Sequence, residues 1–176
     1  MRIHDFRTGV IAAGIIALAS GIFAPVVQAQ GPAEKLGKLK LSAVPEKTGR
    51  PGVLAKYRVA IQVNQNDKAV MDLALNNAKN IIEYYKEKGE AVTVEIVTYG
   101  PGLHMLRSDT SPVKERVAVM SLENPSLVFA ACANTQANQS KAENKAVVLV
   151  GEATVTPSGV VRLMELQKKG YAYIRP

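Results

Sequence analysis

The sequence predicts an α/β fold: a single small domain with a mostly parallel five-stranded sheet and helices on both faces. The first observation is that short β-branched segments alternate with amphipathic segments, in the order β-α-β-α-β-α-β-α-β. The second is that residues 126–131 form a nearly continuous apolar run, as expected of a central parallel strand buried on both faces. Because crossovers between parallel strands are right-handed, such a pattern layers helices against the sheet.

The first half of the domain supplies two strands and one long helix. Residues 57–63 form a β-branched strand, and Asn66 or Asp67 can cap the helix that follows. Apolar residues at helical spacing predict that helix over residues 69–88, ending at Gly89. A second strand covers residues 91–99, and after the Gly-Pro-Gly turn residues 103–107 are expected to form a short helical turn.

The second half repeats the alternation. Ser111 can cap a helix with Pro112 in its first turn, and its apolar side is expected to carry Val113, Val117, Met120 and Leu122. After the strand at 126–131, residues 133–143 are compatible with a polar helix. The next extended segment is expected at residues 147–150 and around Val155, followed by a helix over 158–169 and a last strand at 171–174.

Residues 1–29 have the pattern of a secretory signal peptide. Arg2 and Arg7 precede an apolar stretch at 9–19, and Val27-Gln28-Ala29 supplies small residues at the spacing that a signal peptidase reads. Cleavage after Ala29 would leave 147 of the 176 residues in a periplasmic protein with no further membrane span. The alternative is an uncleaved amino-terminal anchor, because the uncharged stretch is long enough to cross a bilayer.

The positive charge of the chain is concentrated in one segment. The formal net charge is +7, yet residues 30–58 alone carry seven basic and two acidic residues. We therefore divide the chain into a signal peptide (1–29), a basic flexible arm (30–55) and an α/β domain (56–176). The chain lacks tryptophan and any interleaving of basic and aromatic residues, so no nucleic-acid partner is expected.

Cys132 is the single cysteine, and it lies where the apolar strand at 126–131 gives way to small polar residues. A lone thiol in an exported protein is a buried bystander, half of an intermolecular disulfide, or a reactive group. At the carboxyl end of a parallel strand it would lie where α/β sheets bind ligands. A helix starting at residue 133 would also favour the thiolate through its amino-terminal N–H groups.

Four other residues are candidates for the same site. His104 is a candidate proton-transfer group, although a lone histidine in an apolar loop is more often simply packed and hydrogen-bonded. Asn64, Asn134 and Thr135 are polar residues at strand ends that could line a ligand pocket, or could serve only as caps. One histidine and one cysteine cannot form a structural zinc site, and no cofactor-binding motif is present, so neither metal nor cofactor is expected.

Several segments together resemble the DsrE/DsrF-like sulfur-relay family, in particular its exported, mostly uncharacterised branch. The resemblance extends from about Lys56 to the end of the chain. It rests on Val-Ala-Ile-Gln-Val at 59–63, Glu-Ile-Val-Thr-Tyr-Gly-Pro-Gly at 95–102, Val-Phe-Ala-Ala-Cys-Ala-Asn-Thr at 128–135, Thr-Pro-Ser-Gly-Val-Val-Arg-Leu at 156–163 and Gly-Tyr-Ala-Tyr-Ile at 170–174.

The resemblance implies a function for Cys132. Sulfur-transfer members of the family carry a cysteine just after a central strand, which accepts and passes on persulfide sulfur, and Cys132 matches that position. It also implies a homo-oligomer such as a trimer or hexamer, or a hetero-oligomer with related subunits, and a protein that donates or accepts sulfur. Residues 137–141 depart from the arginine-glycine stretch that follows the cysteine in cytosolic members. The alternative is a non-catalytic oligomeric binding or scaffold module in which Cys132 is buried and structural.

Overall fold

The fold is a three-layer arrangement around a parallel sheet, seen in a computed structural model that describes residues 55–176. The predicted signal peptide and almost all of the basic arm lie outside the described residues. The five strands have the order β4-β3-β2-β1-β5, and every neighbouring pair is parallel. The predicted α/β class and five-stranded sheet are therefore confirmed.

The elements follow the predicted order closely. The strands are β1 (Tyr57–Val63), β2 (Val92–Thr98), β3 (Leu127–Cys132), β4 (Ala153–Thr156) and β5 (Ala172–Ile174). The helices are α1 (Lys68–Glu87), the 3-10 helix η1 (Gly100–Leu106), α2 (Lys114–Glu123), α3 (Ala133–Ala142) and α4 (Gly159–Lys168).

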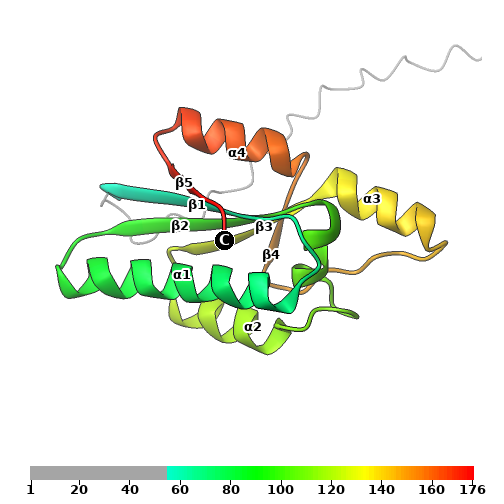
Figure 1. Cartoon of the computed structure of the whole chain (residues 1–176), viewed down its shortest axis with the longest axis horizontal. Helices are drawn as coiled ribbons and strands as arrows, with labels where there is room; N and C mark the ends of the chain where they lie inside the picture. The colour runs from blue at the N-terminus through cyan, green and yellow to red at the C-terminus, as the bar shows by residue number, and fades with distance from the viewer. Residues whose placement is uncertain (1–54) are drawn as a thin grey trace, which may run out of the picture. The chain divides into compact units, whose positions relative to one another are not determined.

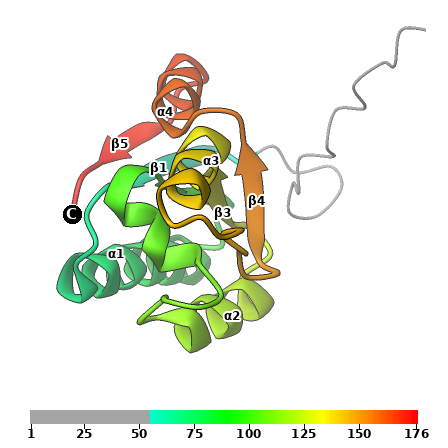
Figure 2. The ribbon, with the colours of Figure 1, turned by 90° about the vertical axis from the view of Figure 1, so that its right-hand side faces the viewer.

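Helices cover both faces of the sheet. In Figure 1, α1 and α2 lie below the strands and α4 lies above them, while α3 extends beyond the ends of the strands. Figure 2 shows the same layers from the side on which α3 projects. Alternate residues of each strand face opposite layers, so Ile61 and Phe129 pack with α1 and α2, whereas Ala60 and Ala130 pack with α4.

Three local predictions need correction. Ser111 does not cap α2: the N-cap is Val113, and the Ser111 hydroxyl instead donates to the Met105 carbonyl at 2.6 Å. Leu122 is 85% exposed rather than part of the apolar side of α2. Residues 147–150 form no strand: Leu149 makes only an isolated bridge with Arg107, and the Val150 N–H donates at 2.9 Å to the carbonyl of Leu106, the last residue of η1.

The first predicted cap is correct. Asp67 is the N-cap of α1, and its side chain accepts a hydrogen bond from the Ala69 N–H at 2.7 Å. This cap begins the helix directly beyond the carboxyl end of β1. The carboxyl ends of β1, β2 and β3 consequently open into Asn64, Tyr99 and the start of α3, at one edge of the sheet.

Candidate functional site

Cys132 lies at the junction of β3 and α3. It is the last residue of the strand and the N-cap of the helix, and its sulfur accepts a hydrogen bond from the Thr135 N–H at 3.4 Å. The residue is only 4% exposed. The predicted address of the thiol, at the carboxyl end of a central strand with a helix amino terminus beside it, is what the structure has.

A second helix also begins beside this sulfur. Cys132 pairs in register with Thr156 of β4, so the turn that leads into α4 runs beside the start of α3. The Asn134 N–H donates to the Pro157 carbonyl at 3.3 Å across this junction. The backbone of Gly159, the first residue of α4, contributes a hydrogen bond that lowers the pKa of the Cys132 thiol.

These contacts determine the electrostatics of the thiol. Burial raises the pKa of Cys132, because it disfavours the charged form. Hydrogen bonds from the Thr135 hydroxyl and from the N–H groups of Gly159, Thr135 and Asn134 act in the opposite direction and outweigh it, so the pKa lies below its ordinary value. The arrangement therefore favours a thiolate, the nucleophilic form of cysteine.

The predicted pocket residues are distributed unevenly around the sulfur. Thr135 contacts it through both its hydroxyl and its N–H, whereas Asn134 does so through its backbone, with an exposed side chain. Asn64 lies at the end of β1 against η1: a Cβ added to Gly102 would come within 2.8 Å of the Asn64 Cα. Binding of a ligand by these three residues stays a prediction.

His104 lies in η1, and its Nδ1 is 2.7 Å from the Thr110 hydroxyl. Among the described residues, no hydrogen bond joins His104 to Cys132. A role for this histidine in proton transfer at the sulfur stays a prediction as well.

Arg107 is a buried cation that the sequence reading missed. It is 1% exposed, and its guanidinium donates to both carboxylate oxygens of Asp109 and of Glu143 and to the side chain of Gln139. These bonds raise the pKa of Arg107 and lower the pKa values of Asp109 and Glu143. The cluster connects the end of η1 to the second half of α3. A local sequence pattern could not predict Gln139 and Glu143 as partners, because they lie 32 and 36 residues from Arg107.

Polar residues on the α4 face of the sheet were missed too. The Glu95 carboxylate forms two hydrogen bonds of 2.7 Å with Arg162 of α4. Gln62 donates to the Tyr99 hydroxyl at 2.5 Å and accepts from the Tyr173 hydroxyl. The sequence does contain a signal, since Gln62 and Glu95 each lie between two apolar residues of a strand, and a buried polar side chain needs a hydrogen-bond partner.

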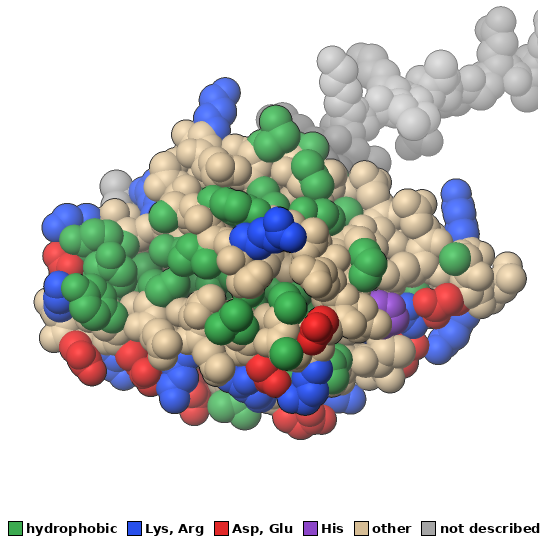
Figure 3. Space-filling model, viewed as in Figure 1, with side chains coloured by type: hydrophobic (Ala, Val, Ile, Leu, Met, Phe, Trp, Pro, Cys, Tyr) green, Lys and Arg blue, Asp and Glu red, His purple; other side chains and the backbone are tan. Residues whose placement is uncertain are grey.

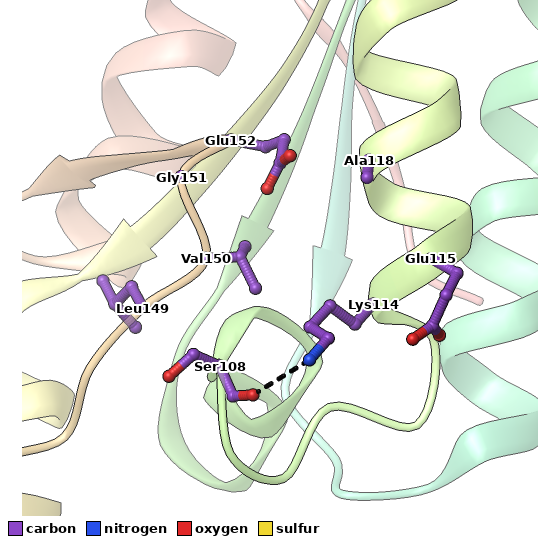
Figure 4. A pocket seen from close by; sticks show the side chains of 8 residues that line it. All are labelled: Ser108, Lys114, Glu115, Ala118, Leu149, Val150, Gly151 and Glu152. Carbon is purple, nitrogen blue, oxygen red and sulfur yellow. Dashed lines mark hydrogen bonds between the residues drawn. The ribbon is translucent and has the colours of Figure 1, made fainter.

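A shallow hollow of about 390 Å³ lies elsewhere, where α2 starts beside the chain that enters β4 (Figure 4). In it the Lys114 ammonium donates to the Ser108 carbonyl at 3.4 Å. The hollow contains none of the predicted site residues, and it lies by the amino-terminal end of β4, whereas Cys132 lies at the carboxyl end of β3. Its lining residues are Ser108, Lys114, Glu115, Ala118, Leu149, Val150, Gly151 and Glu152.

Residues 55–176 contain no group of three or more His, Cys, Asp or Glu side chains placed to hold a metal ion. In the same residues, no helix combines the length and apolar character needed to span a bilayer.

Comparison with known proteins finds a relative among solved structures. No family model matches the chain, and no curated protein matches it. Among solved structures, the chain is similar to MTH1491, a protein of unknown function from Methanobacterium thermoautotrophicum. The two are 30% identical with a TM-score of 0.58, over 68% of this chain and 99% of the archaeal one. This chain therefore belongs to the same protein family as MTH1491.

Proposed function

We propose that this is a periplasmic sulfur-handling protein in which Cys132 accepts or relays persulfide sulfur, or binds a small sulfur compound. The observation that carries the proposal is the set of hydrogen-bond donors around the Cys132 sulfur, which stabilise a thiolate despite its burial. The position of Cys132 after a central strand supports it, as does the resemblance to the DsrE/DsrF-like family. An assembly of several copies, or of related subunits, belongs to the same proposal.

The proposed step is a transfer of sulfane sulfur. The Cys132 thiolate attacks the terminal sulfur of a hydropersulfide, R–S–SH, and a new S–S bond forms at Cys132. The S–S bond of the donor breaks, and R–S⁻ leaves with its electron pair. Cys132 then holds a persulfide, whose outer sulfur an acceptor thiolate removes in the same way, so that no external oxidant or reductant is consumed.

The donors around Cys132 suit this chemistry. The Thr135 hydroxyl and the N–H groups of Asn134 and Gly159 can hold the charge of either a thiolate or a persulfide anion. Because the resting thiol is 4% exposed, the donor would have to reach it by a local movement of the chain beside it.

The experiment is treatment of the purified protein with inorganic polysulfide, followed by intact-mass measurement. We expect a gain of one or more sulfur atoms that dithiothreitol reverses and that the Cys132→Ser variant lacks. A native protein whose thiol is alkylated by iodoacetamide but gains no sulfur would refute the carrier role. Amino-terminal sequencing of protein from the periplasm should begin at Gln30 if the proposed export and cleavage occur.

A second candidate is an oligomeric binding or scaffold module with an inert, structural Cys132. Its support is the burial of the thiol together with the apolar side chains on the surface. Figure 3 shows hydrophobic side chains gathered across the middle of one face, between α4 and α1. Met164 of α4 is 63% exposed and Tyr173 of β5 is 43% exposed.

The rate of alkylation separates the two candidates. An inert cysteine reacts slowly in the native protein and fast after unfolding in urea, whereas a sulfur carrier reacts readily in the native state. Sedimentation of the native protein reports separately whether it forms a trimer or hexamer.

A further inference from the structure

The turn that follows β2, formed by Tyr99 and Gly100, contacts the two helices that begin beside Cys132, α3 and α4. The Gly100 N–H donates to the Thr135 hydroxyl oxygen at 2.9 Å, and the Gly100 carbonyl accepts from the Gln139 side chain at 3.2 Å. Gly100 has a φ of 53°, a left-handed conformation that glycine adopts without strain. Two bonds therefore hold this turn against α3.

The bond from Gly100 restricts the directions in which the Thr135 hydroxyl can donate its proton. A hydroxyl has a single proton to donate and lone pairs to accept with. The Gly100 N–H occupies one lone pair of the Thr135 oxygen, so the hydroxyl keeps its proton for the hydrogen bond to Cys132 that lowers the pKa of the thiol. The turn thus holds the Thr135 hydroxyl as a donor beside the sulfur.

The preceding residue, Tyr99, supports the start of α4. Gly159 is buried, and a Cβ added to it would lie 2.8 Å from the Tyr99 Cβ and 3.1 Å from its Cδ1. Only a residue without a side chain lets the first turn of α4 come so close to Tyr99. That approach brings the Gly159 N–H to the sulfur.

Tyr99 is itself fixed at its far end. Its hydroxyl accepts from the buried Gln62, which also accepts from the Tyr173 hydroxyl of β5. Its backbone N–H donates to the Val63 carbonyl at 3.2 Å, so the turn remains attached to β1. Tyr99 is therefore held from the side chain and from the backbone.

We propose that the Tyr99–Gly100 turn is the positioning element for Cys132, with Gly100 aiming the Thr135 hydroxyl and Tyr99 supporting the Gly159 N–H at the sulfur. The proposal rests on the proposed function only in that both concern the same sulfur. Tyr99 and Gly100 act through other groups, so they are positioning residues rather than catalytic ones.

Two ion pairs join charged side chains on the elements around Cys132. On the α4 face Glu95 pairs with Arg162, and at the far end of α3 Glu143 pairs with Arg107. The groups that lower the pKa of Cys132 are instead neutral hydrogen-bond donors from Thr135, Gly159 and Asn134. The titratable and charged groups on the elements packed around Cys132 are Glu95, Tyr99, His104, Arg107, Lys141, Glu143, Glu152, Arg162, Glu165 and Lys168.

The test measures the pKa of the Cys132 thiol from the pH dependence of alkylation by iodoacetamide, in the whole protein. Gly159→Ala pushes α4 away from Tyr99, so we expect the thiol pKa to rise and alkylation at neutral pH to slow by about tenfold, the effect of one pKa unit. Gly151→Ala is the matched control, because a Cβ there meets nothing within 4 Å, and it should leave the pKa unchanged.

A second pair of variants keeps the test decisive if Gly159→Ala fails to fold. Thr135→Val removes the hydroxyl donor at nearly constant volume and should raise the pKa of the Cys132 thiol. Thr135→Ser keeps the hydroxyl and should have the thiol pKa of the wild type. An unchanged pKa in folded Gly159→Ala, or in Thr135→Val when that variant is the one that folds, overturns the proposal. Sulfur uptake from polysulfide is scored separately: uptake with an unmoved pKa refutes only the positioning role, and a moved pKa without uptake refutes only the carrier function.

Discussion

The two faces of the sheet bury different kinds of side chain. The face under α1 and α2 buries a large apolar cluster, with Ile61, Ile96 and Phe129 contributed by the three central strands. The face under α4 buries the small side chains of Ala60, Val97 and Ala130 together with Leu163 and Leu166. The α4 face also buries Gln62 and Glu95, whereas the buried polar strand residue that alternation places on the other face is the small Thr98, whose hydroxyl donates to the Ala130 carbonyl at 3.2 Å.

The difference shows how the sheet separates stability from site geometry. Apolar packing is non-directional and tolerates small shifts, so it stabilises one face without fixing individual atoms. Hydrogen bonds and ion pairs require particular distances and angles. The α4 face consequently fixes one helix, and with it the Gly159 N–H, beside Cys132.

Truncation of a large core side chain should cause the greatest loss, and it tests the apolar face. Phe129→Ala removes a ring that is almost completely buried between the sheet and the helices, and should reduce the free energy of unfolding by about 3–5 kcal/mol. Urea titration followed by circular dichroism measures it. Leu122→Ala is the control, since an exposed leucine should change stability by no more than about 0.5 kcal/mol. Equal losses in the two variants would contradict this assignment of the core.

Neutralisation of Glu95, the buried carboxylate that pairs with Arg162, should destabilise the protein less, and it tests the α4 face. Glu95→Gln leaves Arg162 without its two charged hydrogen bonds and should destabilise the protein by roughly 1.5–3 kcal/mol, measured by the same titration. Glu165→Gln is matched to it, because Glu165 approaches the same arginine at 3.8 Å but is exposed, and its loss should be below about 0.5 kcal/mol. If Glu165→Gln were the more damaging change, directional contacts would not be what holds α4.

The smallest change in the free energy of unfolding is expected from the pH dependence of the polar cluster around Arg107. Arg107 lowers the pKa values of Asp109 and Glu143 in the folded protein, so their contribution is complete above about pH 4, the ordinary carboxyl range. It is lost as the pH falls through the lowered folded values. The double variant Asp109→Asn, Glu143→Gln should therefore be less stable than the wild type at neutral pH.

The difference between that variant and the wild type should shrink steadily on acidification, when urea unfolding is compared across pH. A difference that stays constant with pH would show that the carboxylate charges do not contribute through Arg107.

The sequence was sufficient for features that depend on local order. The β-branched run of β1, the Asp67 cap and the apolar run of β3 each follow from neighbouring residues, and together they specify the sheet and the address of Cys132. The pairing of Cys132 with Thr156 required strand register, which joins residues far apart in the chain. For the same reason the Gly159 N–H, the Gly100 bond to Thr135 and the partners of Arg107 could not be predicted.

Ser111 illustrates a second kind of error. Its sequence context fits a helix cap, but its hydroxyl bonds to the Met105 carbonyl of η1, and α2 begins further on. A polar side chain with two acceptable partners is assigned by tertiary structure rather than by its neighbours.

The chain order of α4 carries a consequence for biosynthesis. Thr156 of β4 and Gly159 of α4 follow Cys132 in the sequence, so a growing polypeptide contains the sulfur before it contains the strand and helix that lie beside it. During that interval the apolar face can already collapse onto α1 and α2, while the thiol lacks its full shelter. Oxidants or thiol-exchange enzymes met during synthesis would therefore find Cys132 at its most reactive before β4 and α4 are in place.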